Sequence, residues 1–205
     1  MSAFYKVSYR IGFHPWEDLA EHRPFAEALV GLFEREEEGK EPPYGKALDL
    51  GCGSATWGVR LAARGWQVTG VDNVPTAVRR AEGRIRDTGV DMRVVHGDVT
   101  SHLDSAVGTG YDLVVDTGTF HGLIPAQRLA MGSEVSKVAA ADATVILDCF
   151  APRRRGPLPR GCTREDVEQA FPGWQITEVI DADTDPDPIA RMFKFDEVFY
   201  RLRHR

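Results

Sequence analysis

The fold of this chain is decided by one stretch near its front, Ala47-Leu48-Asp49-Leu50-Gly51-Cys52-Gly53. Residues 47–50 form a short, mostly apolar run that is typical of a buried parallel strand. The two glycines that follow allow the backbone to turn sharply and to approach a ligand closely. Because the next residues are expected to form a helix, the stretch predicts a strand, a turn and a helix of an open α/β sheet, with a ligand at the turn.

An acidic residue ends the next predicted strand. Residues 66–71 form a second apolar run, and Asp72 lies nineteen residues after Gly53. In folds of this kind, a carboxylate at this spacing accepts hydrogen bonds from the hydroxyls of a ribose. Turns between strands and helices often contain glycine without binding a ligand. The glycines and Asp72 together, rather than the glycines alone, therefore indicate a site for an adenosine-containing ligand.

The spacing of the glycines separates two classes of cofactor. Turns that bind nicotinamide dinucleotides use G-x-G-x-x-G/A, in which the third small residue allows close helix packing around a pyrophosphate. This chain has Thr56 at that position, and the next glycine, Gly58, comes two residues late. The turn therefore favours a cofactor without phosphates. A nicotinamide-dependent oxidoreductase stays an alternative, as does a cofactor-binding protein without catalysis.

Apolar runs alternate with amphipathic segments along most of the chain, which is the pattern of a doubly wound parallel sheet. A first helix begins at Pro24 and ends at the acidic run of residues 36–38, which is expected to be a solvated helix end. The predicted strands follow in order at residues 47–50, 66–71, 92–95, 111–116 and 143–150. The helices between them end at Arg64 or cover residues 75–89 and about 125–139.

The composition changes after the fifth strand. Residues 151–161 are rich in proline, glycine and arginine and are expected to form a loop, and residues 163–166 resemble a capped helix start. Two further strands are expected at residues 174–179 and 193–202. The acidic residues 181–187 between them begin like a calcium loop but lack its glycine and its glutamate, so we expect a solvated loop.

Bulk properties fit one compact enzyme of the cytoplasm. With 205 residues and 42% hydrophobic composition, the chain can bury the core of a single α/β domain. It contains no apolar stretch long enough for a signal peptide or a membrane span. Its three cysteines lack metal-ligand spacing, so we expect reduced thiols and no metal. The net charge of −6 argues against a general nucleic-acid binder, but not against a small anionic substrate.

The first turn resembles the first motif of the class I S-adenosylmethionine-dependent methyltransferases, which matches residues 48–54. The resemblance implies a Rossmann-like, mostly parallel seven-stranded sheet with an antiparallel last strand. It also implies that S-adenosylmethionine, and its product S-adenosylhomocysteine, bind at the turn and at the ribose acid. The cofactor contacts that it implies there are Asp49, Gly51, Cys52, Gly53, Asp72 and Asn73.

Two further segments match the same family at the ends of strands. In the family, an acid after the third strand reaches the adenine amino group and the next backbone N–H meets the ring, which implies these roles for Asp98 and Val99. The alternative for Asp98 is an Asx turn, because Gly-Asp pairs are common where strands end. Asp116 and Thr117 end the fourth strand, where the resemblance implies backbone contacts with the methionine part of the cofactor.

Residues 116–123 resemble the D-x-G-C-F-H-x-L segment of small-molecule methyltransferases of the thiopurine, tellurite-resistance and heterocyclic-toxin groups, with Thr119 where cysteine is common. The resemblance implies that Phe120 and His121 lie near the methyl acceptor. A neutral His121 imidazole could take a proton from a phenolic or heterocyclic hydroxyl. The alternative is a histidine that donates a hydrogen bond to a loop carbonyl, and the local sequence does not separate the two.

The residues before the sheet resemble the N-terminal lid of the same enzymes. Residues 1–40 are therefore expected to form a lid and helix, and residues 41–205 the methyltransferase domain. Trp16 would contact the cofactor near its sulfonium, whose charge is attracted to an aromatic ring, and Tyr9 would contact the acceptor. The alternative is that the aromatic residues of this segment pack the first helix onto the domain.

The arginine-rich loop after the fifth strand offers a last candidate contact. Arg155, with Arg153 and Arg154, could bind an anionic group of the substrate because binding loops gather at such strand ends. The alternative is a solvated loop. Together, these observations predict a monomeric or homodimeric methyltransferase that needs no metal and whose partner is a small aromatic or heterocyclic acceptor with a reactive oxygen, sulfur or nitrogen.

Overall fold

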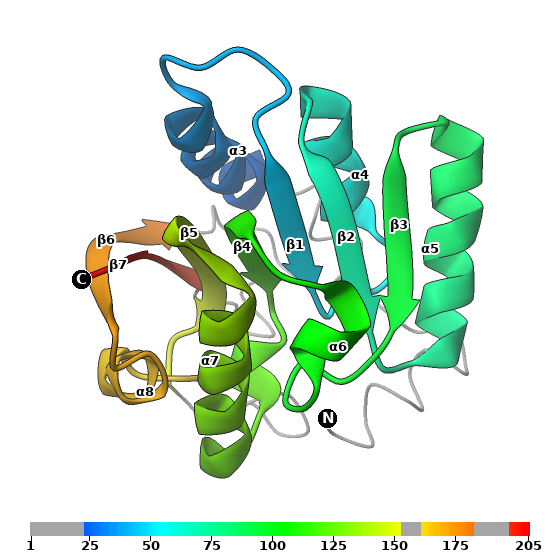
Figure 1. Cartoon of the computed structure of the whole chain (residues 1–205). Helices are drawn as coiled ribbons and strands as arrows, with labels where there is room; N and C mark the ends of the chain where they lie inside the picture. Colours follow the sequence, from blue (N-terminus) through cyan, green and yellow to red (C-terminus); the bar gives the residue numbers. More distant parts are fainter. Residues whose placement is uncertain (1–22, 153–160, 183–196) are drawn as a thin grey trace.

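The computed structural model describes residues 23–152, 161–182 and 197–205. Its strands form a seven-stranded sheet in the order β3-β2-β1-β4-β5-β7-β6 (Figure 1). The strands are β1 (Lys46–Leu50), β2 (Gln67–Asp72), β3 (Met92–His96), β4 (Tyr111–Thr117), β5 (Ala139–Phe150), β6 (Trp174–Ala182) and β7 (Glu197–His204). Strands β1 to β5 pair in parallel, and β7 is antiparallel to both of its neighbours. The predicted mostly parallel sheet with an antiparallel last strand is confirmed.

Helices cover both faces of the sheet (Figure 1). One face carries α3 (Arg23–Glu37), α4 (Thr56–Arg64) and α5 (Pro75–Thr88), and the other carries α6 (Leu103–Val107), α7 (Pro125–Val138) and α8 (Arg164–Ala170). A short 3-10 helix, η1 (Phe120–Gly122), follows β4. The sequence did not predict α6, because a helix of five residues is too short to establish a helical period.

Local sequence signals place several helix ends. Pro75 opens α5, where its missing N–H needs no partner, and Gly65 ends α4 with a φ of 114°. At α8, the Thr163 hydroxyl accepts a hydrogen bond from the Asp166 N–H, and Asp166 accepts one from the Thr163 N–H. These reciprocal bonds satisfy two amides that the helix cannot pair itself, so the predicted capped start is confirmed.

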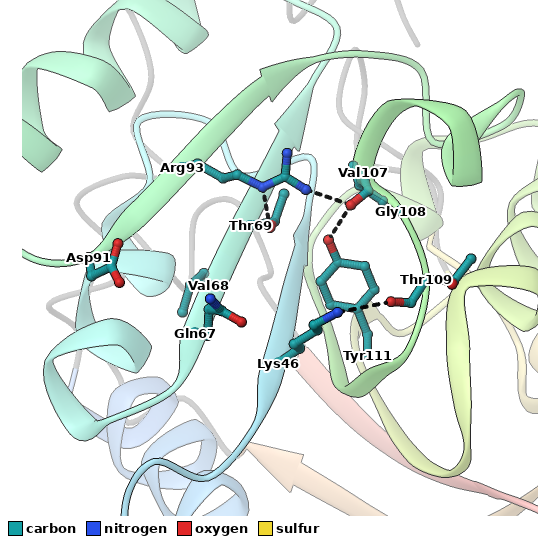
Figure 2. Close-up of a pocket in the computed structure, with 10 residues that line it drawn as sticks. All are labelled: Lys46, Gln67, Val68, Thr69, Asp91, Arg93, Val107, Gly108, Thr109 and Tyr111. Carbon is teal, nitrogen blue, oxygen red and sulfur yellow. Dashed lines mark hydrogen bonds between the residues drawn. The ribbon is translucent and has the colours of Figure 1, made fainter.

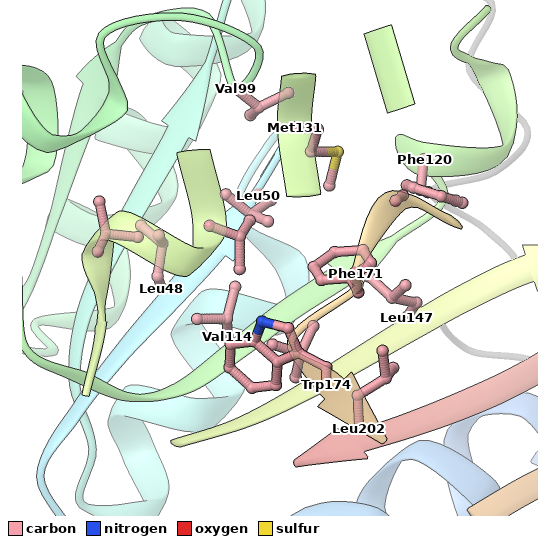
Figure 3. Close-up of a cluster of buried hydrophobic side chains, with 14 of the residues drawn as sticks. Leu48, Leu50, Val99, Val114, Phe120, Met131, Leu147, Phe171, Trp174 and Leu202 are labelled. Carbon is pink, nitrogen blue, oxygen red and sulfur yellow. The ribbon is translucent and has the colours of Figure 1, made fainter. Parts of the chain in front are cut away.

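Each face of the sheet packs on its own hydrophobic cluster. In the cluster of Figure 3, Phe120, Met131 and Phe171 pack together between the sheet and the helices α7 and α8. Trp174 lies beside them, and its indole N–H donates to the Ser136 hydroxyl at 2.9 Å. Because each large apolar side chain contributes roughly 1.5–3 kcal/mol when fully buried, these two clusters hold the helices against the sheet.

The acidic run at the end of α3 corrects one prediction. Glu36 and Glu37 are 4% and 9% exposed, so the expected solvated helix end is wrong at these residues. Glu36 accepts hydrogen bonds from Arg201 at 2.7 Å and from Thr144 at 2.7 Å. Glu37 accepts hydrogen bonds from Arg64 at 2.8 Å and from the indole N–H of Trp66 at 3.0 Å. The charges are buried because each has a charged partner on a distant strand or helix, which the local sequence does not reveal.

The contact between α7 and α8 leads to a prediction about stability. A Cβ atom on Gly132 would lie 1.9 Å from the backbone oxygen of Ala170, whereas a Cβ on Gly31 in α3 would meet nothing within 4 Å. We expect Gly132→Ala to lower the free energy of unfolding by about 1–3 kcal/mol through overpacking. Gly31→Ala, the matched control, should raise it by up to about 1 kcal/mol. Urea unfolding of both variants measures this, and equal changes would refute the packing argument.

Candidate functional site

The turn after β1 is built from residues in the left-handed region of backbone conformation. Gly51, Gly53 and Ala55 have φ values of 61°, 55° and 62°. Glycine adopts this conformation without steric cost, whereas Ala55 costs roughly 1–2 kcal/mol there. The Cys52 N–H donates to the Val71 carbonyl at 3.1 Å, which fixes the turn against the end of β2. The turn therefore stands at the carboxyl-terminal edge of the sheet, as the sequence predicted.

Asp72 ends β2 and faces this turn. One of its carboxylate oxygens accepts a hydrogen bond from the Gly53 N–H at 3.0 Å, and the other accepts from the Val74 N–H at 2.7 Å. Burial raises the pKa of Asp72, and these backbone N–H groups oppose that rise. A carboxylate has about four acceptor sites, so the two bonds orient the group and leave capacity for two hydroxyl donors.

Asp49 lies on β1, directly below the turn, and is 1% exposed. Neither of its carboxylate oxygens has a hydrogen-bond partner in the part of the chain that the structure describes. Burial, followed by the negative charge of Asp116, raises the pKa of Asp49 to about 8. The Gly58 N–H lowers that pKa electrostatically, without normal hydrogen-bond geometry. A buried carboxylate without a partner is costly, so a cationic ligand group would be stabilised here.

Asp116 ends the buried part of β4 and holds the loop that follows. Its two oxygens accept from the Thr119 N–H at 2.8 Å and the Phe120 N–H at 2.7 Å, at the start of η1. Burial raises its pKa to about 7. The Thr119 hydroxyl donates to the Leu50 carbonyl at 3.3 Å and lies where a Cβ on Gly51 would stand. Thr119 thus ties the β4 loop to the first turn, a role that sequence reasoning missed.

The side chains of Cys52 and Asn73 take different directions from the turn. The Cys52 sulfur packs against Gly70 of β2. A Cβ atom at Gly70 would lie only 2.8 Å from this sulfur, so the glycine makes room for it. Burial raises the pKa of Cys52 well above its ordinary value, so it stays a neutral thiol. The side-chain oxygen of Asn73 is buried without a hydrogen-bond partner among the described residues. Asn73 is therefore the second group near Asp72 with an unsatisfied polar atom.

The residues after β3 and β4 lie along the same edge of the sheet. Asp98 is exposed, and one of its oxygens accepts from the Thr100 N–H at 2.8 Å and from the Thr100 hydroxyl at 2.7 Å, which is the Asx turn weighed as an alternative. The turn occupies one oxygen only, so an adenine contact through the other stays a prediction. The Val99 side chain is 7% exposed and belongs to a hydrophobic cluster. Thr117 lies opposite Asp148 of β5.

His121 is 3% exposed and stacks on Phe150, with 4.2 Å between the ring centroids and 19° between the planes. Its Nδ1 accepts a hydrogen bond from the Phe150 N–H at 3.1 Å. A nitrogen that accepts carries no proton, so the neutral ring is protonated on Nε2 and can donate from there. This geometry favours a hydrogen-bond donor over the general base that the sequence suggested.

The other predicted substrate contacts are placed only in part. Phe120 is fully buried, 6.0 Å from the Phe171 ring, and the Arg128 guanidinium lies 5.5 Å from its centroid. Its side chain thus packs in the core, and a contact with the acceptor stays a prediction. The remaining candidates, Tyr9, Trp16 and Arg155, lie outside the described residues.

A separate pocket of about 280 Å³ lies at the opposite edge of the sheet (Figure 2). It is lined by residues at or near the starts of strands, including Lys46, Gln67, Arg93 and Tyr111. The Arg93 guanidinium is held there by the Thr69 hydroxyl at 3.0 Å and by a backbone carbonyl. Ligands of open α/β sheets bind at the carboxyl ends of the strands, so this pocket is not the cofactor site.

Two buried carboxyl groups were not predicted as site residues. Asp148, on β5, and Glu197, at the start of β7, are 3% and 4% exposed. The sequence did offer a signal for Asp148, because it is a charged residue inside the apolar run of residues 143–150. Among the described residues, no group of three or more histidines, cysteines or acids is arranged to hold a metal ion. Their helices include none long and apolar enough to cross a membrane.

The comparisons with known proteins agree with this geometry. Residues 47–142 match the family model described as a methyltransferase domain. The 2-heptyl-1-hydroxyquinolin-4(1H)-one methyltransferase of Mycobacteroides abscessus is 33% identical over 132 residues, which are 60% of this chain and 55% of that protein. The ribosomal RNA small subunit methyltransferase C of Alcanivorax borkumensis is 38% identical over 77 residues, 38% of this chain and 22% of that protein. The chain thus spans about half, or less, of the length of these relatives.

A solved structure matches nearly the whole chain. The 1,6-didemethyltoxoflavin-N1-methyltransferase of Burkholderia thailandensis, with bound 1,6-didemethyltoxoflavin and S-adenosylhomocysteine, has a TM-score of 0.73 at 17% identity. The match covers 98% of this chain and 86% of that one. The chain thus has the fold of the class I, S-adenosylmethionine-dependent methyltransferases. Its residues 47–142 are similar to the methyltransferase domain of that family model.

The buried state of Asp49 leads to a prediction about pH. The ordinary pKa of the carboxyl is 3.8, and its pKa in the folded chain is about 8. Between these values the folded chain keeps a proton that the unfolded chain has lost, so this contribution to stability falls as the pH rises. We expect Asp49→Asn to raise the free energy of unfolding by roughly 3 kcal/mol more at about pH 8 than at about pH 5.

The control is Asp142→Asn, at an exposed position near the start of β5. It should change the free energy of unfolding equally at both pH values. Urea titrations of wild type and both variants measure the difference. If the effect of Asp49→Asn were the same at the two pH values, Asp49 would be ionised throughout and its proposed environment would be wrong.

Proposed function

We propose that the chain transfers the methyl group of S-adenosylmethionine to a small aromatic or heterocyclic acceptor, at oxygen, sulfur or nitrogen. The observation that carries this proposal is the buried Asp49 carboxylate, whose oxygens have no partner among the described residues. The methionine part of this cofactor carries an ammonium group, which is the kind of charge that such a carboxylate stabilises. Asp49 lies beside a turn where Gly51 and Gly53 permit close approach.

The other residues at the carboxyl-terminal edge of the sheet fit the remaining parts of the cofactor. Asp72 is oriented by two backbone N–H groups and would accept hydrogen bonds from the ribose hydroxyls. Asn73 offers a side-chain oxygen without a partner among the described residues to the same ribose. Asp98 and Val99 would meet the adenine. The backbone at Cys52, Asp116 and Thr117 would line the methionine part, and the proposal requires no metal.

When bound, S-adenosylmethionine supplies an activated methyl group that an acceptor can displace directly. The chain would then contribute mainly by holding the acceptor atom about 3 Å from the reacting carbon and by excluding water. His121 and Phe150 form a stacked pair at the end of β4 and β5, which suits the flat face of an aromatic acceptor. His121 would orient the acceptor from this stacked pair.

The choice of a small acceptor rests on two supports. The M. abscessus relative is named for a small quinolone, and its match covers more of this chain than the ribosomal RNA enzyme does. The net charge of −6 disfavours a phosphate backbone as partner. The proposal includes a cytoplasmic location, a monomer or homodimer, and an N-terminal lid that precedes helix α3 within residues 1–40. Tyr9, Trp16 and Arg155 would complete the site from outside the described residues.

The cofactor assignment predicts the effect of one substitution. Asp72→Ala removes charge-assisted hydrogen bonds to the ribose, so it should weaken S-adenosylmethionine and S-adenosylhomocysteine alike, by about thirtyfold. Calorimetric titration measures both affinities, with circular dichroism to check folding. Asp142→Asn should bind both ligands like the wild type, and NAD should bind to none of the three proteins. An unchanged affinity of a folded Asp72→Ala variant would remove Asp72 from the site.

The proposed role of His121 predicts a second result. If the imidazole orients the acceptor, His121→Ala should slow methyl transfer to a phenol of high pKa and to an already ionised thiol by similar factors. Cofactor affinity should change by no more than a factor of about three. A general base would instead slow the phenol alone, by about 10²- to 10⁴-fold. Turnover of both acceptors by the wild type and the variant decides between the roles.

A further inference from the structure

Asp148 and Glu197 lie together at the carboxyl-terminal edge, next to the site described above. Asp148 of β5 is the register partner of Thr117 in β4, and Glu197 of β7 is the partner of Phe150 in β5. Alternate residues of a strand and register partners share a face of the sheet, so Asp148, Phe150 and Glu197 point to the same side. Phe150 is also the ring on which His121 stacks. The two carboxyl groups therefore adjoin the stacked pair proposed to receive the acceptor.

This carboxyl pair is buried and incompletely satisfied. Asp148 is 3% exposed and Glu197 is 4% exposed. One oxygen of each, Oδ1 of Asp148 and Oε2 of Glu197, has no hydrogen-bond partner in residues 23–152, 161–182 and 197–205. The arginines of β7 that follow, Arg201 and Arg203, are engaged with Glu36 instead. One oxygen of each carboxyl group is thus left for a donor that the described chain does not supply.

Such a pair does not stabilise the fold by itself. Two carboxyl groups in one buried place cannot both ionise without a counter-charge, and each unpaired oxygen costs free energy. Burial raises the pKa of Glu197 to about 8, and burial together with Glu197 raises that of Asp148. Groups perturbed in this way gather at functional sites, where a ligand supplies the missing partner. The missing partner here is a donor with positive charge.

The Asp148–Glu197 pair and Asp49 lie at different places along the edge, so a ligand of the pair would be distinct from the cofactor group beside Asp49. Asp49, Asp116 and Asp148 lie on β1, β4 and β5, which are consecutive neighbours in the sheet. Asp116 acts electrostatically on both of the others. Its register partners Leu50 and Leu147 place it on the opposite face of the sheet, so Asp49 and Asp148 share one face and Asp116 lies between them on the other. Asp49 stands beside the first turn, and the Asp148–Glu197 pair stands on and beyond β5, away from that turn.

We propose that Asp148 and Glu197 form the docking point of the acceptor and select an aromatic or heteroaromatic molecule that carries a cationic nitrogen with N–H donors. This inference rests on the proposed function, because it assigns the substrate class of that site. The docked nitrogen satisfies the two free oxygens while the ring lies against Phe150 and His121. An acceptor that is already an anion, such as a thiolate, is disfavoured by the same charges.

The test uses matched aromatic probes that differ in charge, titrated calorimetrically into the full chain saturated with S-adenosylhomocysteine. Benzamidine and tryptamine are cations, and benzamide and tryptophol are their neutral counterparts. The wild type should bind at least one cation about tenfold or more tightly than its counterpart. Asp148→Asn and Glu197→Gln, which keep the side-chain shape, should each remove most of this preference and leave the neutral probes within about twofold. Asp142→Asn should behave like the wild type.

Three results would overturn the inference: no preference for either cation in the wild type, an unchanged preference in both variants, or equal loss of cationic and neutral probes. The preceding titration with S-adenosylhomocysteine reports separately on the proposed function. If the cofactor product fails to bind, the proposed function fails, and the probes are titrated alone. If the product binds and the cation preference is absent, only the assignment of Asp148 and Glu197 fails. If one of the two variants does not fold, the other is used alone, because the inference predicts the same loss of cation preference for both.

Discussion

The hydrogen bond from the Gly53 N–H to Asp72 joins the first turn to the end of the second strand, and the geometry of the site depends on it. With the bond from Val74, it fixes a buried carboxylate between two segments of backbone. The turn can take this path because Gly51 and Gly53 have positive φ values. Thr119 then closes the turn from the β4 loop by donating to the Leu50 carbonyl. Three strands thus place their ends around one point.

Several buried acids at this edge stand without ion pairs. Elsewhere in the described chain, buried acids such as Glu36 and Glu37 have arginine partners. Asp49 and the Asp148–Glu197 pair instead keep unpaired oxygens. Buried acids with a structural role are usually paired, as Glu36 and Glu37 are. The unpaired acids at the carboxyl-terminal edge are therefore better explained as groups that bind a ligand. A cationic cofactor group beside Asp49 and a cationic acceptor beside the Asp148–Glu197 pair would both be stabilised.

Much of the fold could be predicted from the sequence, because its signals are local. The apolar runs, the proline and glycine ends of helices, and the Thr163 cap each act within a few residues. The spacing from Gly53 to Asp72 was enough to predict that these two residues meet at the carboxyl-terminal edge of the sheet. What failed was long-range: Glu36 was expected in solvent because Arg201, its partner, lies far away in the sequence. The tautomer of His121 and the pairing of Asp148 with Glu197 depend in the same way on contacts that only the folded sheet creates.

The central claim, that Asp49 waits as a protonated acid for the ammonium group of the cofactor, is tested most directly by counting protons. Titration of S-adenosylhomocysteine at about pH 7, in two buffers of different ionisation enthalpy, gives the number of protons exchanged on binding. Because the pKa of Asp49 is about 8 before the ligand binds, the wild type should release about one proton and Asp49→Asn none. Equal proton release by the two proteins, or none by either, would contradict the account.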